Sequence, residues 1–451
     1  MDKDYILNNV DDFSAEQHFD FINQGIVSLD DLRNTGDLAA SKRSAIVALQ
    51  SIGEKEDDAA WEIARYGNES KLSDYITNYP TGKHVSDAKQ KIDNLERERE
   101  NGRLAKQGII DNIQINPNKY SPKQIRDYLQ NGTLTESDLI NCGIPKSAIE
   151  NLNNIQKQEL KLGDTPTSIP EGFTEVYLWG STGSGKTCAL GAILHKAEQK
   201  GYLNIVPGKG SFYATQLKNI FSDDGIANDY LPPPSPLETT QYLPFTLKYP
   251  NETFSRSVSL IELSGEIFKC FFWNNNEIEF PTEDHVKTFN SLNSFLSSKN
   301  KKIHFFFIDY SRENKPDVKG IKPSDYLAAA STYLNNNNIF NKTTDAIYVV
   351  LTKSDLLADD NGNKIPEEKR VEYAKKHLND DKYSSFINTL KNSCKKNSIN
   401  GGKLTVEPFS LGEVYFQDIC NFNGNSADKI VEILMDRIPV NKKSIFDVFN
   451  K

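Results

Sequence analysis

The chain has 451 residues, of which 37% are hydrophobic and 25% are charged, and its formal net charge at pH 7 is -9. This length suffices for roughly two or three domains with at least one sizeable core, and the negative charge argues against nucleic acid as a partner. No run of eighteen apolar residues and no apolar signal core at the start are found, so we expect no membrane span. The five cysteines lack metal-ligand spacing and favour a reduced, cytoplasmic compartment.

Residues 1–160 are predicted to be helical and to form an interaction region. They contain an internal repeat, because FSAEQHFDFINQGIVSLDDL, which begins at Phe13, aligns without a gap with YSPKQIRDYLQNGTLTESDL, which begins at Tyr120. In each copy we expect a glycine to end one helix and a hydroxyl residue, followed by an acid three positions later, to cap the next. These residues are Gly25, Ser28 and Asp31 in the first copy and Gly132, Thr135 and Asp138 in the second. Each copy is therefore a helix pair that must bury one face, either for packing alone or as a protein-recognition module.

The segment between the two copies, residues 57–96, carries apolar side chains at helical spacing that are interrupted by a YPTG turn. It resembles a short helical repeat unit found beside signalling domains in many bacterial multidomain proteins. We expect the helical region as a whole to bind a protein partner.

A change of pattern follows residues 161–172, KLGDTPTSIPEG, whose Gly, Pro and Thr content is typical of a linker. From residue 173 to residue 440, strand-like runs alternate with helical stretches. The runs are TEVYLWG, YLPFTLKY, SVSLIEL, IHFFFIDY, DAIYVVLT and KLTVEPFSL. This alternation predicts an α/β domain with a mainly parallel sheet. Residues 441–451 are expected to be a C-terminal tail, either flexible or a docking peptide.

A phosphate-binding loop follows the first of these strands. The segment GSTGSGKT has a glycine, four residues and then Gly-Lys-Thr, with an apolar strand before it and an amphipathic helix after it. Its glycines let backbone amides curl around phosphate oxygens, and the following helix adds the positive end of its dipole. We expect Lys186 to reach the β- and γ-phosphates and Thr187 to bind magnesium. The residues expected to contact the nucleotide are Gly180, Ser181, Gly183, Ser184, Gly185, Lys186 and Thr187.

The strand DAIYVVLT leads into TKSD, which is similar to the [NT]KxD guanine-specificity motif of GTPases and comprises Thr352, Lys353 and Asp355. The Asp355 carboxylate can accept two hydrogen bonds, from the ring N–H and the exocyclic amine of guanine, and adenine offers neither in that geometry. Lys353 would lie along the plane of the base. GTPases contact the guanine carbonyl through a loop after the last strand, and this implies Ser410 and Leu411 here. The alternative is a surface TKSD that only caps a turn.

Two strand-like runs joined by a tight turn stand directly before the motif ELSG. An antiparallel hairpin before an ExxG or DxxG motif is what TRAFAC-class P-loop GTPases show, and the strand and motif orders resemble that class over residues 174–437. Within bacteria, the chain resembles the GTPase-like domains of conflict and defence systems. The resemblance implies an α/β, P-loop NTPase fold of the G-domain type. Its mainly parallel sheet would have one antiparallel hairpin and would be preceded by an all-α helical domain.

The same resemblance implies roles for residues near the ELSG motif. Glu262 stands where the family usually has aspartate, and it can hold a magnesium-bound water with shifted geometry. Gly265 can offer its backbone N–H to a γ-phosphate. Glu266 stands where many members position water with Gln or His; its carboxylate could orient water, act as a base, or merely face solvent. The family's magnesium-binding threonine is expected at Thr240 rather than Thr239, and both precede the first hairpin strand.

These features predict a GTP-binding switch that hydrolyses GTP to GDP with Mg²⁺, with Lys186 and Glu266 as catalytic residues. Residues 222–241 and 262–275 would report the nucleotide state. The negative charge of Glu266 would repel the γ-phosphate, so slow intrinsic hydrolysis is expected, and an arginine from a GTPase-activating partner would accelerate it. Asp309, at the end of IHFFFID, could be structural or face the site. Two alternatives stay open: a catalytically silent nucleotide-binding scaffold, and a P-loop ATPase in which TKSD is fortuitous.

Overall fold

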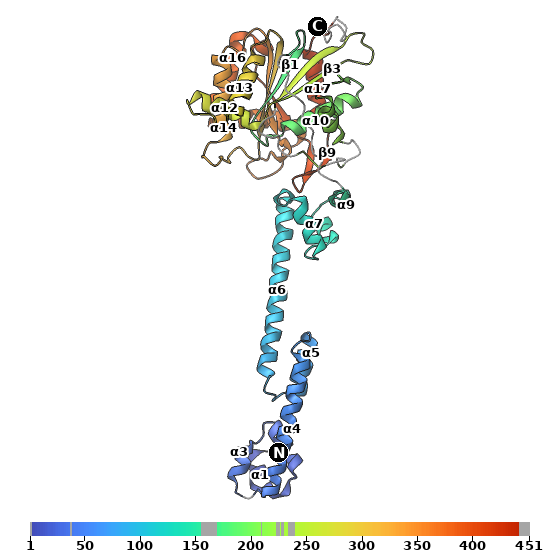
Figure 1. Cartoon of the computed structure of the whole chain (residues 1–451), viewed down its shortest axis with the longest axis vertical. Helices are drawn as coiled ribbons and strands as arrows, with labels where there is room; N and C mark the ends of the chain where they lie inside the picture. Colours follow the sequence, from blue (N-terminus) through green and yellow to red (C-terminus); the bar gives the residue numbers. More distant parts are fainter. Residues whose placement is uncertain are drawn as a thin grey trace. The chain divides into compact units, whose positions relative to one another are not determined.

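The computed structural model describes residues 2–36, 38–154, 169–208, 210–221, 226, 230–232 and 240–441. The chain forms two compact units, residues 1–111 and 112–451, and each is described by itself (Figure 1). Most of the expected linker, Thr239 and all but the first residue of the expected tail lie outside the described residues. Among the helices of the described ranges, none combines the length and the apolar composition that a membrane span requires.

The first unit is built from helices alone. They are α1 (Lys3–Asn8), α2 (Ala15–Asn23), α3 (Leu29–Asn34), α4 (Ala40–Ala64), α5 (Glu69–Asn78) and α6 (Val85–Ile115), with a short 3-10 turn η1 (Val10–Asp12). Ser28 caps α3 in both directions: its hydroxyl accepts from the Asp31 N–H at 3.0 Å, and the Asp31 carboxylate accepts from the Ser28 N–H at 2.8 Å. Gly25, between α2 and α3, has a φ of 70°, so it takes the left-handed conformation that the turn requires.

The second copy of the repeated sequence belongs to the second unit. It forms α7 (Pro122–Gln130) and α8 (Glu136–Asn141), with η2 (Pro117–Lys119) before it and α9 (Lys146–Asn154) after it. The local construction matches that of the first copy, because Thr135 and Asp138 form the same reciprocal cap and Gly132 has a φ of 75°. This similarity follows from the shared sequence, since caps and glycine turns depend on residues within a few positions of one another.

A seven-stranded sheet forms the centre of the second unit, in the order β2-β3-β4-β1-β5-β6-β7. The strands are β1 (Thr174–Trp179), β2 (Leu203–Ile205), β3 (Gln241–Leu247), β4 (Arg256–Glu262), β5 (Lys301–Asp309), β6 (Thr344–Thr352) and β7 (Thr405–Phe409). Only β3 runs against its neighbours, and it forms the antiparallel hairpin with β4. The predicted fold class is therefore confirmed. The sequence reading missed the short edge strand β2 and a small separate hairpin of β8 (Gly412–Tyr415) and β9 (Ile419–Phe422).

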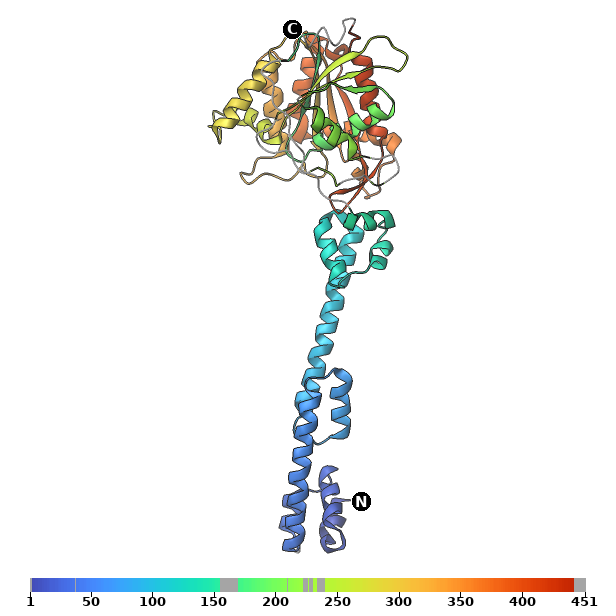
Figure 2. The same cartoon turned by 45° about the vertical axis from the view of Figure 1, so that its right-hand side comes forward.

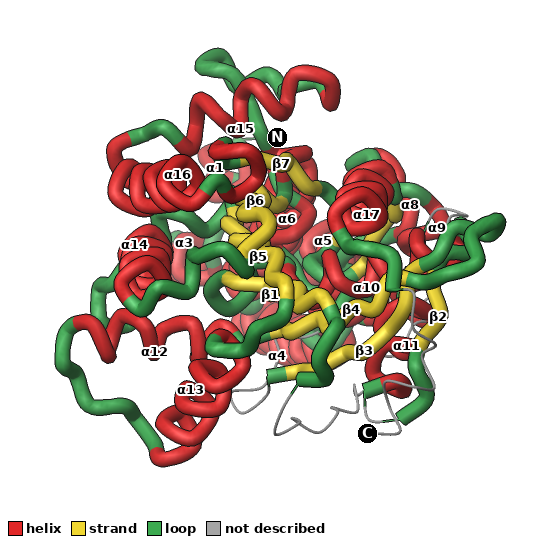
Figure 3. The backbone as a smooth tube through the Cα atoms, turned by 90° about the horizontal axis from the view of Figure 1, so that it is seen from above, coloured by secondary structure: helices red, strands yellow, loops and turns green. Residues whose placement is uncertain are grey.

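Helices cover both faces of this sheet, as Figure 3 shows. One face packs against α10 (Lys186–Gln199), α11 (Ser211–Asn219) and α17 (Asn425–Arg437). The other packs against α12 (Gly265–Asn275), α13 (Glu283–Leu296), α14 (Pro323–Asn336), α15 (Arg370–Leu378) and α16 (Ser384–Asn397). Because both faces are covered, strands such as β1 are buried along their whole length, with Val176 and Leu178 on one side and Tyr177 and Trp179 on the other.

This architecture brings distant segments of the chain to one edge of the sheet. Strands β4, β1, β5, β6 and β7 are parallel neighbours, so their carboxyl ends and the loops that follow them lie side by side. In open α/β sheets, ligands bind at that edge. The predicted phosphate loop, the ELSG motif and TKSD each follow one of these strands.

Candidate functional site

The phosphate loop connects the central strand β1 to α10. Gly180, Gly183 and Gly185 all have positive φ angles, and Gly185 is the N-cap residue of α10. A Cβ on Gly180 would lie 2.6 Å from the Phe307 carbonyl oxygen of β5, so only glycine fits between the two strands. The loop is therefore held against the sheet at its start and against a helix N-terminus at its end, which is the arrangement that binds phosphate.

Lys186 lies across the inside of this loop. Its ammonium donates to the carbonyl oxygens of Gly180 at 2.8 Å and Ser181 at 3.1 Å, and to the Ser184 hydroxyl at 3.3 Å. Burial lowers the pKa of Lys186 to about 8, and the Glu262 carboxylate opposes that shift. The loop thus presents a buried cation whose charge depends on what else occupies the site.

A group of oxygen atoms gathers beside Lys186 at the start of α10. The Thr187 hydroxyl donates to one oxygen of the Glu262 carboxylate, and the Tyr213 hydroxyl donates to the other at 2.8 Å. Glu262 is buried at the end of β4, where it pairs in register with Leu178 of β1 and Gln241 of β3. That register brings the buried Thr240, one residue before β3, to the same end of the hairpin.

These oxygens fit a magnesium ion. Mg²⁺ prefers oxygen ligands and uses one or two from the protein, with water and substrate phosphates completing its shell. Within the described ranges, no group of three or more His, Cys, Asp or Glu residues could hold a metal. Thr187 and Glu262 present oxygen atoms of the kind that a metal held jointly with phosphate takes. Sequence reasoning missed Tyr213, since α11 carries no motif that points to Glu262.

The ELSG motif lies against the apex of the phosphate loop. Ser264 caps α12 through its hydroxyl, which accepts from the Ile267 N–H at 3.2 Å, and Gly265 is the first residue of the helix. A Cβ on Gly265 would collide with the backbone of Thr182, at distances that real Cβ atoms essentially never show. The Gly265 backbone is therefore in direct reach of the loop, as its expected role at a γ-phosphate requires.

The Glu266 carboxylate is held between two other side chains. Both of its oxygens accept from Lys269, at 2.6 Å and 2.8 Å, and one accepts from the Thr182 hydroxyl at 3.2 Å. The ion pair with Lys269 offsets part of the negative charge that was expected to repel a phosphate. No sequence motif points to Lys269, which reaches Glu266 because residues three apart on a helix share a face.

The TKSD motif is joined to the phosphate loop at the end of β6. The Thr352 hydroxyl donates to the carbonyl oxygens of Ser184 at 3.0 Å and Ile308 at 3.1 Å. Lys353 has a φ of 56°, and its ammonium donates to the Asp309 carboxylate and to the Ser311 hydroxyl, both at 2.9 Å. Asp309 thus has a defined place in the site, as the partner of Lys353.

Asp355 meets the loop that follows β7. Its carboxylate accepts a hydrogen bond of 2.7 Å from the Ser410 hydroxyl, which in turn accepts from the Gly412 N–H at 3.0 Å. The Ser410 N–H is bound by the Ser426 hydroxyl at 3.1 Å, and Leu411 packs against the core. Two segments that are 55 residues apart in the sequence are therefore joined where a base-recognition site was expected.

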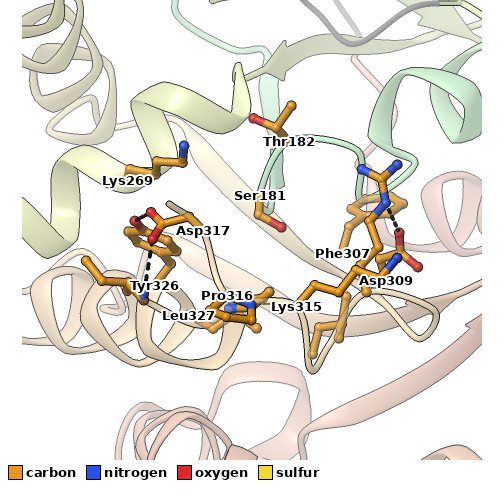
Figure 4. A pocket seen from close by; sticks show the side chains of 14 residues that line it. Ser181, Thr182, Lys269, Phe307, Asp309, Lys315, Pro316, Asp317, Tyr326 and Leu327 are labelled. Carbon is orange, nitrogen blue, oxygen red and sulfur yellow. Dashed lines mark hydrogen bonds and ion pairs between the residues drawn. The ribbon is translucent and has the colours of Figure 1, made fainter. Parts of the chain in front are cut away.

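A cavity of about 420 Å³ opens beside the apex of the phosphate loop (Figure 4). It is bounded by the loop apex, by α12, by the end of β5 and by the segment that leads into α14. The polar residues that line it are Ser181, Thr182, Lys269, Asp309, Arg312, Lys315, Asp317 and Tyr326. Three of these side chains are cationic and two are acidic, so the cavity wall next to the loop has an excess of positive charge.

No family model matches the chain, and no curated protein matches it. Among solved structures, it is similar to the Ski7 GTPase-like domain of S. cerevisiae bound to GTP, with 18% identity, a TM-score of 0.28, and coverage of 60% of this chain and 51% of that one. The same domain bound to GDP and inorganic phosphate has 17% identity and a TM-score of 0.29, with the same coverage. A protein from Thermus thermophilus has 12% identity and a TM-score of 0.23, covering 61% of this chain and 41% of that one.

The chain therefore spans about half the length of the Ski7 domain structures. At this identity and TM-score, the likeness carries no argument about function.

Proposed function

We propose that this protein binds GTP and hydrolyses it to GDP in the presence of Mg²⁺. The observation that carries the proposal is the Asp355 carboxylate, which Ser410 orients at 2.7 Å and which follows directly on a strand end tied to the phosphate loop through Thr352. A carboxylate in this place selects guanine, because it matches the two adjacent N–H donors of that base. One continuous set of contacts therefore runs from a base-recognition group to a phosphate loop.

The phosphate end supplies the groups that phosphoryl transfer needs. Lys186 neutralises charge on the β- and γ-phosphates, and the Gly265 N–H and the loop amides orient their oxygens. Thr187 and Glu262 would hold the metal, with Thr240 adjacent, and a bound Mg²⁺ supplies further neutralisation of phosphate charge. Catalysis in such a site rests on positioning and electrostatics, because the protein makes no covalent bond to the substrate.

Glu266 is the residue that we assign to the attacking water. Its carboxylate lies at the apex of the phosphate loop, where it accepts a hydrogen bond from the Thr182 hydroxyl. A carboxylate can accept a hydrogen bond from that water and so orient it. The contact with Lys269 fixes the orientation of Glu266 and lowers its repulsion of the phosphate, but it also competes for the oxygens that would accept from water.

The helical residues 1–160 are proposed to bind a protein partner, and part of this region contacts elements near the nucleotide site. Asn118 donates to a β8 carbonyl at 2.7 Å and accepts from the Gln417 N–H at 2.7 Å, next to the loop that carries Ser410. Arg126 donates at 2.8 Å to the Tyr230 hydroxyl, between α11 and β3. In Figure 2 the short helices that follow α6 lie beside the small hairpin of β8 and β9. A partner that binds this part of the helical region would thus be coupled, through these contacts, to segments that flank the nucleotide. All five cysteines are thiols rather than half-cystines, which supports the cytoplasmic location that we propose.

The test of this function is a comparison of GTP with ATP on the purified full-length protein. Isothermal titration calorimetry in the presence of Mg²⁺ should show that GTP and GDP bind at least about a hundredfold more tightly than ATP. With ATP bound, the Asp355 carboxylate would face the mismatched groups of adenine. Chromatography of the same mixtures should show conversion of GTP to GDP. Tight GTP binding without conversion would instead support the silent scaffold, and a preference for ATP would support the ATPase. Chelating the Mg²⁺ with EDTA should stop the conversion.

Proton uptake is expected when a nucleotide binds above about pH 8, because the pKa of Lys186 is about 8 in the free protein. A bound polyphosphate favours the charged ammonium and raises that pKa. Below this pKa, Lys186 is protonated both in the free protein and in the nucleotide-bound protein, so binding takes up no proton. Above it, binding must add a proton, so the affinity falls by up to about tenfold per pH unit.

Titration near pH 9 in two buffers of different ionisation enthalpy measures this uptake directly. Guanosine is the matched control, since it offers the base without any phosphate and should bind without taking up the proton. Equal proton uptake with guanosine, or an affinity for GDP that rises with pH in this range, would show that Lys186 is not the group that takes up the proton.

A further inference from the structure

Arg312 lies over the middle of the phosphate loop, although no sequence motif points to it. If Gly183 carried a Cβ, that atom would be 3.3 Å from Arg312 Cζ and in collision with Nη1. The guanidinium thus takes the space that the missing side chain of Gly183 leaves open. The amides of this stretch of loop are those that cradle the phosphates next to the scissile bond.

The backbone around Arg312 is anchored on both sides. On one side, the Arg312 N–H donates to the Asp309 carbonyl at 3.2 Å, at the end of β5. On the other side, the buried Glu313 carboxylate accepts from His377 at 2.5 Å and from Lys382 at 2.6 Å. The segment is therefore pre-positioned by the fold, which is what a group acting in a transition state requires.

The guanidinium of Arg312 has weaker contacts than the ammonium groups of Lys269 and Lys353. Lys269 is bound to both oxygens of Glu266, and Lys353 is bound to Asp309. Arg312 is paired with Asp309 only at 3.8 Å, which is longer than a hydrogen bond, and its side chain is 55% exposed. It can therefore turn its donors to a phosphate oxygen without breaking a strong contact.

Resting on the GTP hydrolysis proposed above, we propose that Arg312 is a catalytic residue by which this chain supplies its own arginine. The water oxygen forms a bond to the γ-phosphorus, and the bond from that phosphorus to the β–γ bridging oxygen breaks. The electron pair stays on the β-phosphate of GDP, and the water's proton leaves with the inorganic phosphate or to solvent. The Arg312 guanidinium donates to the bridging oxygen as its charge grows. A partner then need not contribute an arginine.

The experiment compares the wild-type full-length protein with Arg312→Ala, Arg312→Lys and Lys319→Ala. Lys319 is exposed on the same segment and outside the cavity, so its replacement removes an equal charge without touching the phosphate loop. Single-turnover GTP hydrolysis and GTP affinity are measured for each. We expect Arg312→Ala to lower the hydrolysis rate about a hundredfold or more, to change the affinity less than about threefold, and to recover part of its rate in millimolar guanidinium. Arg312→Lys should retain little of the wild-type hydrolysis rate, since an ammonium lacks the planar pair of donors of a guanidinium.

The outcomes separate this proposal from the function on which it rests. Wild-type protein that binds no GTP, or binds it without hydrolysis, overturns both. If the wild-type protein hydrolyses GTP and the Arg312→Ala variant does so at the same rate, only the catalytic assignment of Arg312 is overturned. The assignment is likewise overturned if the GTP affinity and the hydrolysis rate of Arg312→Ala fall by the same factor, because Arg312 would then serve ground-state binding. Loss in Arg312→Ala that Lys319→Ala does not share, with rescue by guanidinium, supports the assignment.

Discussion

Replacing Asp355 with asparagine is expected to change the preferred base from guanine to xanthine. Ser410 donates to one oxygen of the Asp355 carboxylate at 2.7 Å, and the carbonyl oxygen of an asparagine can accept that same bond. The local fold is then retained, while the second oxygen becomes an NH₂ group. Guanine presents N–H donors to that position, whereas xanthine has a carbonyl in place of the exocyclic amine and can accept from the new donor.

The expected loss of GTP affinity in Asp355→Asn is about a thousandfold, since a site built to hydrogen-bond one pattern rejects the mismatched one strongly. Competition between GTP and xanthosine triphosphate for a bound fluorescent nucleotide measures the change for both ligands. Asp360→Asn is the matched control, because Asp360 is exposed five residues further along the same segment. Undiminished GTP binding by Asp355→Asn would mean that TKSD does not read the base, and the P-loop ATPase would become the better hypothesis.

Replacing Gly265 with alanine is expected to disable hydrolysis through a steric effect. Gly265 is the first residue of α12 and has no positive φ, so alanine suits its backbone conformation. The added Cβ would nevertheless collide with the backbone N and Cα of Thr182 at the apex of the phosphate loop. Backbone atoms cannot rotate away as the end of a side chain can, so either α12 or the loop must move.

That movement carries the Gly265 N–H and Glu266 away from the γ-phosphate. A misplacement of about 1 Å can cost about a hundredfold in rate, and the overpacking should lower the free energy of unfolding by about 1–3 kcal/mol. Single-turnover hydrolysis and thermal unfolding measure the two effects. Gly108→Ala is the control, since a Cβ at Gly108 in α6 meets no atom within 4 Å and should leave hydrolysis unchanged. Wild-type hydrolysis by Gly265→Ala would show that this close approach has no part in the reaction.

Features whose signals lie within a few neighbouring residues could be predicted from the sequence. The phosphate loop could be read directly, because three glycines, a lysine and a threonine at fixed spacing have to form a tight turn before a helix. The helix caps at Ser28 and Thr135 depend on residues within three positions and formed as predicted. All six predicted strand runs contain strands, since a sheet that is covered on both faces requires continuous apolar segments.

The assignment of both Asp355 and Ser410 to the base is a different kind of prediction. It came from resemblance to a family in which the corresponding motifs bind one base, and neither segment alone indicates the other. The structure supplies the cause, which is that β6 and β7 are parallel neighbours and end at the same edge of the sheet.

The side chains that complete the site could not be predicted from the sequence, because they come from distant segments that the folded chain brings together. Tyr213 reaches Glu262, and Arg312 covers Gly183, from segments that have no motif of their own. The two copies of the repeat have the same local signals, yet they fall in different compact units. The reason is that Arg126 in the second copy, and Asn118 just before it, contact residues roughly a hundred or more positions later in the chain. The physical reason is common to these cases: a cap or a turn is stabilised within a few residues, whereas these contacts exist only after the strand order has brought distant loops to one edge.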